Sequence, residues 1–367
     1  MKTPILPAFT AFTALALLAC TDPSASESGT DQGSDPTSTT TDDPDAEGST
    51  AGPDTSEPDG SDTSSLDSTG GSTGTSTDDD PERTHIPEEG VEFIEANGEQ
   101  FGYFAEGEGP LVLLLHGFPD TPHTFDDLRP ALAAAGFFAV SPFMRGYTPS
   151  SIPAGDAFDA QTLGEDALAL IEAFGEQEAY IVGHDFGAFA AYAAASLDPA
   201  RVRRLVTVAI PHPGFFVPDP EFFERASHFI YLAEDDAEAL MRADDFAHVD
   251  ELYARWSPTW RFEPAETEPV KNAFAAPGSL NAALGYYRAS SPVPPPFLQV
   301  PLPMDTLTIA GLDDGVMLPE GFEQTAAGFS GEWTLLTVDG GHFVHRENPG
   351  QVVPAVVEFL ASDGAGE

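Results

Sequence analysis

The chain has 367 residues, of which 41% are hydrophobic, and a formal net charge of −47. Its 14 Lys and Arg residues stand against 61 Asp and Glu residues, so we expect no nucleic-acid partner, because phosphate binding needs clustered cations. The single cysteine excludes an intramolecular disulfide framework.

The N-terminal segment is an apolar stretch that ends in Leu17-Leu18-Ala19-Cys20. This ending resembles a bacterial lipobox, in which the cysteine is lipidated and becomes the mature N-terminus. An apolar run of about 15 residues is short for a membrane span and fits a signal-peptide core, with an uncleaved anchor as the alternative. We therefore expect residues 1–20 to be a lipoprotein signal peptide and the protein to be exported. A lipid at Cys20 would anchor it to a membrane, in the periplasm or at the cell surface.

The composition divides the rest of the chain into two parts. Residues 21–86 are almost entirely Ser, Thr, Asp, Gly and Pro, and such a segment cannot build a core. We expect a disordered linker that acts as a tether of tens of ångströms, since a flexible chain of n residues spans ~5–6 Å × √n. Residues 87–367 are predicted to form one catalytic domain.

Short aliphatic and β-branched runs alternate with helix-like stretches in this domain, which predicts an α/β fold with a mostly parallel sheet flanked by helices. Residues 91–94 and 103–104 are predicted to form an N-terminal hairpin. The core strands are predicted at residues 111–115, 137–140, 180–182, 205–210, 306–310 and 333–338. The helices are predicted at residues 122–135, 162–174, 186–197, 320–327 and 351–360.

The alternation of strands and helices stops between about residues 213 and 298. This segment is rich in Phe, Tyr and Trp and closes with a proline-rich stretch at 292–303. We predict a helical cap inserted after the sixth strand, with most of its aromatic residues forming the cap's own core. An apolar lid over the carboxyl ends of parallel strands is where a ligand site is expected.

A nucleophile elbow is predicted at Gly183-His184-Asp185-Phe186-Gly187, because an apolar strand precedes this motif and an alanine-rich helix follows it. Asp185 stands where a serine is usual. A serine that attacked a saturated carbon would leave an ether, whereas a carboxylate leaves an ester whose carbonyl water can attack. Asp185 therefore predicts alkyl transfer and argues against esterase, lipase, lactonase and peptidase chemistry.

The other parts of a hydrolytic site follow in the expected order. His342, after the last strand, is predicted to be the general base, and either Asp313 or Asp314 would orient it. The backbone N–H groups of Phe118 and Phe186 are predicted to form the oxyanion hole, the second of them with help from the helix dipole. The spacing of His342 and His345 could suit zinc, but no further ligand is in motif spacing, so we expect no metal and no cofactor.

Three motifs carry a family resemblance: HGFPD at 116–120, GHDFG at 183–187 and GGHF at 340–343. In this order they resemble the epoxide hydrolase and haloalkane dehalogenase branch of the α/β-hydrolase fold family, from about Val91 to the C-terminus. The resemblance favours Asp314 over Asp313 and implies a small apolar epoxide or a halogenated compound as the substrate.

The cap residues bear on the choice between these two substrates. Epoxide hydrolases of this family protonate the departing alkoxide with cap tyrosines, typically two. The segment Gly285-Tyr286-Tyr287-Arg288 is similar to the family's aromatic-Tyr-Arg segment, which makes Tyr287 the proton donor. The second place would fall to His228 or Tyr231, and an alignment without gaps puts His228 there.

The dehalogenase alternative loses support at the two oxyanion-hole positions. Haloalkane dehalogenases commonly hold the halide with Trp or Asn side chains at these positions, whereas the side chains of Phe118 and Phe186 donate no hydrogen bond. Phe186 also stands where fluoroacetate dehalogenases have an arginine. Residues 228–232, however, are similar to the segment in which those enzymes carry a halide-binding His-Trp pair.

The sequence therefore predicts an epoxide hydrolase-like enzyme that forms a covalent ester on Asp185 and releases diols. The alternatives are a haloalkane or haloacid dehalogenase and a catalytically inactive surface-binding lipoprotein.

Overall fold

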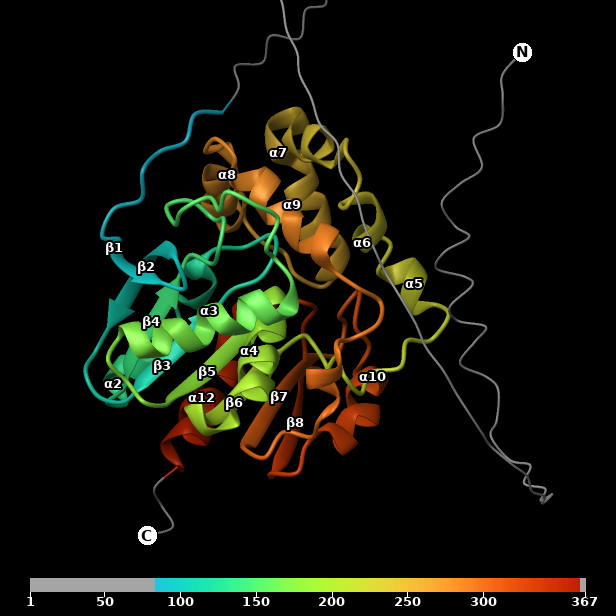
Figure 1. Cartoon of the computed structure of the whole chain (residues 1–367). Coiled ribbons are helices and arrows are strands. Elements are labelled where there is room, and N and C mark those ends of the chain that lie inside the picture. The colour runs from blue at the N-terminus through green and yellow to red at the C-terminus, as the bar shows by residue number, and fades with distance from the viewer. Residues whose placement is uncertain (1–82, 364–367) are drawn as a thin grey trace, which may run out of the picture. The chain divides into compact units, whose positions relative to one another are not determined.

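The computed structural model describes residues 83–363 (Figure 1). The predicted signal peptide, the lipidation site Cys20 and all but the end of the predicted linker lie outside these residues. Within residues 83–363, no helix has both the length and the apolar character needed to cross a membrane.

An eight-stranded sheet forms the centre of the described part, in the order β1-β2-β4-β3-β5-β6-β7-β8. The first two strands and the β2–β4 pair are antiparallel, and all later pairs are parallel. The mostly parallel sheet and the N-terminal hairpin are thus confirmed. The strands are β1 (Glu92–Ala96), β2 (Glu99–Glu106), β3 (Leu111–Leu115), β4 (Phe138–Pro142), β5 (Ala179–His184), β6 (Val202–Val208), β7 (Asp305–Gly311) and β8 (Trp333–Val338).

Helices cover both faces of the sheet. The helices α3 (Ala160–Ala173) and α4 (Phe186–Leu197) pack on one face, and α2 (Leu128–Ala134) and α12 (Pro349–Ala361) pack on the other (Figure 1). In β3, Leu111, Leu113 and Leu115 belong to the first of these cores, whereas Val112 and Leu114 belong to the second. Because both faces are buried, the strand is an unbroken apolar run and not an alternating one.

Two predicted helices are wrong in their extent. The helix predicted at 122–135 is a 3-10 turn, η1 (Pro122–Phe125), followed by the shorter α2. Pro130 has no N–H to donate to the carbonyl of Asp126, so a continuous helix would lack a bond at this point. The helix predicted at 320–327 is likewise split into α10 (Pro319–Glu323) and η5 (Gln324–Gly328). The short helices η2 (Pro199–Arg201) and α11 (Val344–Glu347) were not predicted.

The segment between β6 and β7 is helical and lies above the sheet in Figure 1; we call residues 213–298 the cap. The longest cap helix is interrupted at Asp244, Asp245 and Phe246, which have left-handed φ values of 50°, 54° and 63°. The cap elements are α5 (Phe222–Arg225), α6 (His228–Tyr231), α7 (Ala237–Trp256), η3 (Pro264–Glu266), α8 (Glu268–Ala275) and α9 (Ser279–Ala289), and η4 (Pro296–Gln299) ends just beyond them.

The segment that precedes β1 is attached to the cap; we call residues 83–90 the strap. Arg83 pairs with Asp245 and with Glu268, each at 2.7 Å. The backbone N–H of Ile86 donates to Oδ1 of Asn272 at 2.7 Å, and the amide of Asn272 donates back to the carbonyl of Ile86 at 2.8 Å. The chain therefore contacts the cap before it enters the sheet.

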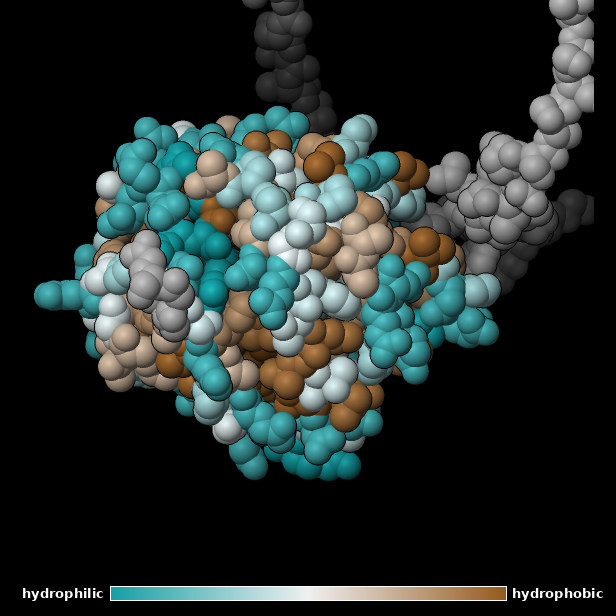
Figure 2. Space-filling model, turned by 90° about the horizontal axis from the view of Figure 1, so that it is seen from below, coloured by the Kyte–Doolittle hydropathy of each residue, from teal (hydrophilic) through white to brown (hydrophobic). Residues whose placement is uncertain are grey.

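Most of the chain's Asp and Glu residues belong to the described part. Figure 2 shows one face of the molecule, on which hydrophilic residues cover a large part and a group of hydrophobic residues lies in the lower middle. A hydrophilic, strongly acidic exterior favours solubility and disfavours contact with anionic partners.

Candidate active site

Asp185 lies at the sharp turn between β5 and α4, with a left-handed φ of 52° and ψ of −121°. A non-glycine residue in such a conformation costs roughly 1–3 kcal/mol, and strain of this kind is concentrated at functional sites. Two glycines permit the turn. A Cβ atom on Gly187 would lie 1.9 Å from the carbonyl oxygen of Leu115, and one on Gly183 would lie 2.3 Å from the carbonyl oxygen of Gly187. The chain folds here so that one side chain is lifted above the sheet.

The carboxylate of Asp185 is held by the turn that follows the neighbouring strand, β3. Its Oδ1 atom accepts a hydrogen bond from the backbone N–H of Phe118 at 2.8 Å. Gly117 makes this approach possible, because a Cβ atom there would lie 2.4 Å from the same oxygen. The N–H of Phe186 opens α4, where the helix dipole contributes positive potential. Both predicted oxyanion-hole donors therefore lie next to Asp185.

His342 stands between two carboxylates. Its Nδ1 atom lies 3.1 Å from Oδ2 of Asp314, and its Nε2 atom lies 3.5 Å from Oδ2 of Asp185. The other oxygen of Asp314 accepts from the backbone N–H groups of Val316 and Met317 at 2.7 and 3.0 Å. The structure thus brings together Asp185, His342 and Asp314, whereas Asp313 is exposed.

The charges of this group are coupled. Burial alone would lower the pKa of His342, but the charge of Asp314 and the bonds to both carboxylates outweigh it and raise the pKa to about 10. Burial would raise the pKa of Asp185, but the imidazole of His342 and the N–H of Phe118 bring it below its usual value. In the resting site Asp185 is therefore an anion beside the imidazolium of His342.

Two cap residues face this group. The ring of Tyr287 packs edge-on against those of Phe118 and Phe186, with centroids 4.9 and 5.1 Å apart. The ring of His228 lies 5.9 Å from that of Tyr287. Burial raises the pKa of Tyr287 well above its usual value and lowers the pKa of His228 to about 3, so the phenol keeps its proton and the imidazole stays neutral.

Tyr231 is placed differently from His228. Its hydroxyl lies 3.2 Å from Nε2 of His248, and its side chain is only partly buried. Of the two residues that the sequence proposed beside Tyr287, it is His228 whose ring contacts the tyrosine.

Trp256, at the end of α7, is a site residue that the sequence did not reveal. Its ring centroid lies 4.7 Å from that of His228 and 5.3 Å from that of His342. Its carbonyl oxygen accepts from the backbone N–H groups of His342 and Gly315, at 3.1 and 2.9 Å. Its indole N–H is buried and has no hydrogen-bond partner among the described residues. No motif marks this residue, because its role depends on where the cap docks.

The histidines near the elbow are buried. Nε2 of His184 lies 3.1 Å from the carbonyl oxygen of His342, and Nε2 of His345 lies 2.6 Å from the hydroxyl of Thr124. Within residues 83–363, no group of three or more His, Cys, Asp or Glu side chains is arranged to hold a metal ion.

The chain is similar to several known proteins. A sequence model of the alpha/beta hydrolase fold matches residues 110–349. An epoxide hydrolase of Caballeronia sordidicola is 30% identical over 308 residues, covering 73% of this chain and 92% of the relative. The AB hydrolase superfamily protein YfhM of Bacillus subtilis (strain 168) is 28% identical over 281 residues, covering 73% of this chain and 97% of that protein. The crystal structure of a Bacillus megaterium epoxide hydrolase in complex with an inhibitor shares the fold, with a TM-score of 0.67 and 23% identity over 73% of this chain and 99% of that chain.

Proposed function

The chain belongs to the alpha/beta hydrolase fold family, and from this premise we propose that it is an epoxide hydrolase that works through a covalent ester on Asp185. The observation that carries the proposal is the position of this carboxylate, 2.8 Å from the N–H of Phe118 and 3.5 Å from Nε2 of His342. A carboxylate at the elbow, with a base beside it and a phenol opposite, suits attack on a strained saturated carbon.

The first step forms the ester. Oδ2 of Asp185 attacks an epoxide carbon, the bond from that carbon to the ring oxygen breaks, and the oxygen takes the proton of the Tyr287 hydroxyl. The neutral imidazole of His228 donates a hydrogen bond to the same oxygen. Because both cap residues are uncharged, they stabilise the developing alkoxide without forming an ion pair with Asp185.

The second step breaks the ester at its carbonyl. The imidazolium of His342 first gives its proton to the Tyr287 phenolate left by the first step and becomes neutral. His342 then takes a proton from water, the hydroxide adds to Cγ of Asp185, and the N–H groups of Phe118 and Phe186 stabilise the resulting oxyanion. The intermediate collapses, the diol oxygen leaves with the proton from His342, and the proton of the regenerated carboxylic acid passes to His342, which restores the resting carboxylate and imidazolium. The oxygen of the water remains in the carboxyl group of Asp185.

Esterification also prepares the base for this step. The ester is neutral, so the imidazole of His342 loses the anion on its Nε2 side and its pKa falls toward neutrality. The pKa of about 10 applies to His342 before the ester forms, when the reaction does not yet need a base.

A substrate panel with isotope labelling tests the proposal. Single turnover of small epoxides in heavy-oxygen water is expected to yield diols and to place the label in the peptide that contains Asp185. Turnover without label in that peptide would contradict the covalent mechanism. Haloalkanes and haloacids are included in the panel, and halide is quantified beside diol.

One observation favours a dehalogenase as a second candidate. The buried indole N–H of Trp256 has no partner in the described part of the chain and lies beside His228, so the site holds neutral donors of the kind that stabilise a departing halide. Halide release without diol formation from the panel would support this candidate. Tight binding without turnover would support the inactive binding lipoprotein.

We further propose that the enzyme is anchored to a membrane through a lipid on Cys20, on the strength of the Leu17-Leu18-Ala19-Cys20 pattern. Membrane fractionation of the producing cells tests this. The unaltered protein is expected in the membrane fraction and the Cys20→Ser variant in the soluble fraction; equal distribution of the two would overturn the proposal.

A further inference from the structure

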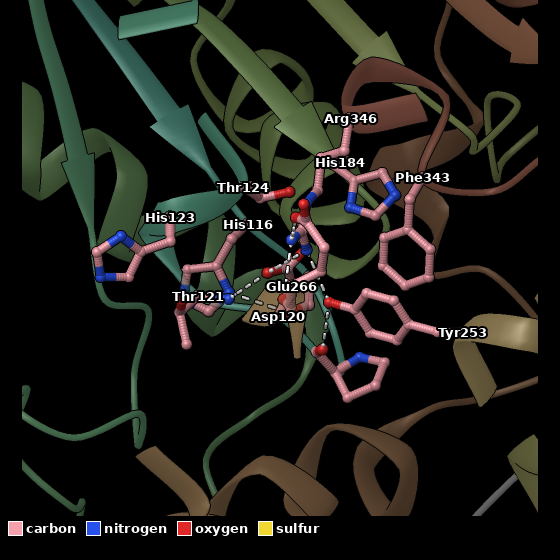
Figure 3. A network of polar contacts seen from close by, with 12 residues as sticks. His116, Asp120, Thr121, His123, Thr124, His184, Tyr253, Glu266, Phe343 and Arg346 are labelled. Carbon is pink, nitrogen blue, oxygen red and sulfur yellow. Dashed lines mark hydrogen bonds and ion pairs between the residues drawn. The ribbon is translucent and has the colours of Figure 1, made fainter. Parts of the chain in front are cut away.

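Arg346 lies four residues after His342, in α11, and its buried guanidinium joins three separate parts of the protein (Figure 3). The Nη1 atom donates to both carboxylate oxygens of Asp120, at 3.3 and 3.2 Å, and to the Tyr253 hydroxyl at 2.8 Å. The Nη2 atom donates to the carbonyl oxygen and to Oε2 of Glu266, at 2.8 and 2.7 Å. The loop that carries His342 is thereby tied to the turn at Asp120 and to the cap.

The turn that Arg346 holds is the one that carries the donor to the nucleophile. Phe118, whose N–H binds Asp185, is separated from Asp120 only by Pro119, and the Tyr253 hydroxyl donates to the carbonyl oxygen of Pro119 at 3.2 Å. Pro119 and Asp120, which follow Phe118, are therefore each held by a side chain that lies outside the turn.

Both charged groups of the Arg346–Asp120 pair are buried. Asp120 is 2% exposed, and the side chain of Arg346 is 10% exposed. A buried carboxylate that loses its cation retains an uncompensated charge, so the turn would be expected to move toward another partner or toward water. The ring of Tyr253 stacks on that of Phe343, with centroids 4.0 Å apart, so it also braces the residue beside His342.

The two chemical steps make opposite demands on the Phe118 N–H. During ester formation Asp185 loses its negative charge, so the hydrogen bond weakens on the way to the transition state. During ester hydrolysis negative charge develops on the carbonyl oxygen of the ester, so the hydrogen bond strengthens. A displaced donor therefore slows hydrolysis and not ester formation.

We propose that Arg346 and Tyr253 are positioning residues that hold the Phe118 N–H in place for the hydrolysis of the ester. The inference rests on the proposed function and deepens it, because it assigns to a cap residue and to an arginine of α11 a role in one step of the reaction. Neither residue touches the reacting atoms; both act through the turn at residues 118–120.

The test measures the two steps separately. Rapid-quench mass spectrometry after mixing with an epoxide gives the rate of ester formation and the fraction of protein that carries the ester at steady state. Tyr253→Phe keeps the ring and removes the hydroxyl, and Arg346→Lys keeps the charge and removes the planar fork. Because removal of an oxyanion-hole donor typically costs ~10²–10³ in rate, a displaced donor is expected to slow hydrolysis by roughly tenfold.

Both variants should therefore accumulate more ester than the unaltered protein, with the rate of ester formation little changed. Arg129→Lys is the matched control, since Arg129 is a similarly buried arginine that pairs with Glu106 and Asp126 and not with the catalytic loops. If Arg346→Lys does not fold, Tyr253→Phe alone carries the test. Unchanged hydrolysis in a folded Tyr253→Phe variant overturns the positioning role, whereas the absence of any ester in the unaltered protein overturns the proposed function itself.

Discussion

The Nε2 atom of His342 faces the Oδ2 atom of Asp185 across 3.5 Å. This distance is too long for a strong hydrogen bond but short enough for the charge of each group to set the pKa of the other. The proposed nucleophile and the proposed base are therefore electrostatically coupled, and a change in the charge of Asp185 changes the basicity of His342.

We expect the substitution Asp185→Asn to lower the pKa of His342 from about 10. The substitution replaces the anion beside Nε2 of His342 by a neutral amide, and Asp314 remains. An opposite charge at this distance typically changes the pKa of its neighbour by ~1–3. NMR titration of the histidine ring measures the change. Asp126→Asn is the control, since Asp126 pairs with His123 and not with His342. An unshifted pKa for His342 in Asp185→Asn would show that the two groups are not coupled.

The same pair predicts a dependence of stability on pH. The pKa of His342 is raised from 6.5 in a free histidine to about 10, so the pair stabilises the folded protein fully below about 6.5 and progressively less as the pH rises through about 10. The difference in free energy of unfolding between the unaltered protein and Asp185→Asn should shrink over this interval. Urea unfolding at several pH values measures it, and a difference that grew with pH would contradict the assignment.

His342→Gln is expected to trap the ester. Loss of a general base typically slows a step by ~10²–10⁴, and the step that needs the base is hydrolysis and not alkylation. Intact-protein mass spectrometry after exposure to an epoxide should show the mass of one substrate added to the chain. The control is His248→Gln, because His248 lies in the cap and binds Glu251 and Tyr231. A variant with no adduct but normal turnover would exclude His342 as the base.

Tyr287→Phe should slow ester formation and not ester hydrolysis. Its hydroxyl is the proposed proton source for the departing alkoxide, so the rate of ester formation is expected to fall by ~10²–10⁴ while the affinity for an unreactive substrate analogue changes little. Tyr286→Phe is the matched control, since the hydroxyl of Tyr286 donates to the carbonyl of Arg145 and not toward Asp185. Rapid-quench kinetics distinguishes the two variants. Equal losses in both would mean that packing, and not proton donation, is affected.

The fold and the site differ in how far the sequence could predict them. Local signals sufficed for the strands and for the helix after Asp185, whose predicted bounds, 186–197, are those of α4. They failed around Pro130, because this proline lacks the N–H that a continuous helix over 122–135 would need. Asp185, Asp314 and His342 could be proposed because each follows a strand of the same sheet. Trp256 could not, because its contact with His342 depends on long-range packing of the cap.

The strap includes the last residues of the predicted linker, 83–86, and its contacts predict a measurable coupling to the cap. A truncated protein that begins at Val91 loses the pairs of Arg83 with Asp245 and Glu268 and the two hydrogen bonds between Ile86 and Asn272. Exposed ion pairs contribute ~0–1 kcal/mol each and hydrogen bonds ~0.5–1.5 kcal/mol each, so we expect a loss of about 1–5 kcal/mol in the free energy of unfolding relative to a protein that begins at Arg83.

The loss of stability should be largest in the part of the cap that the strap contacts. Hydrogen–deuterium exchange is expected to become faster in α8, because Glu268 and Asn272 both lie on that helix, and to stay unchanged in α12 on the far side of the sheet. The control is Arg288→Ala, which removes an exposed cap arginine that contacts Asn281 and not the strap. Since α8 packs against α9, the helix that carries Tyr287, faster exchange in α8 should be accompanied by slower ester formation. Equal melting temperatures and equal exchange in the two proteins would show that the strap rests on the cap without stabilising it.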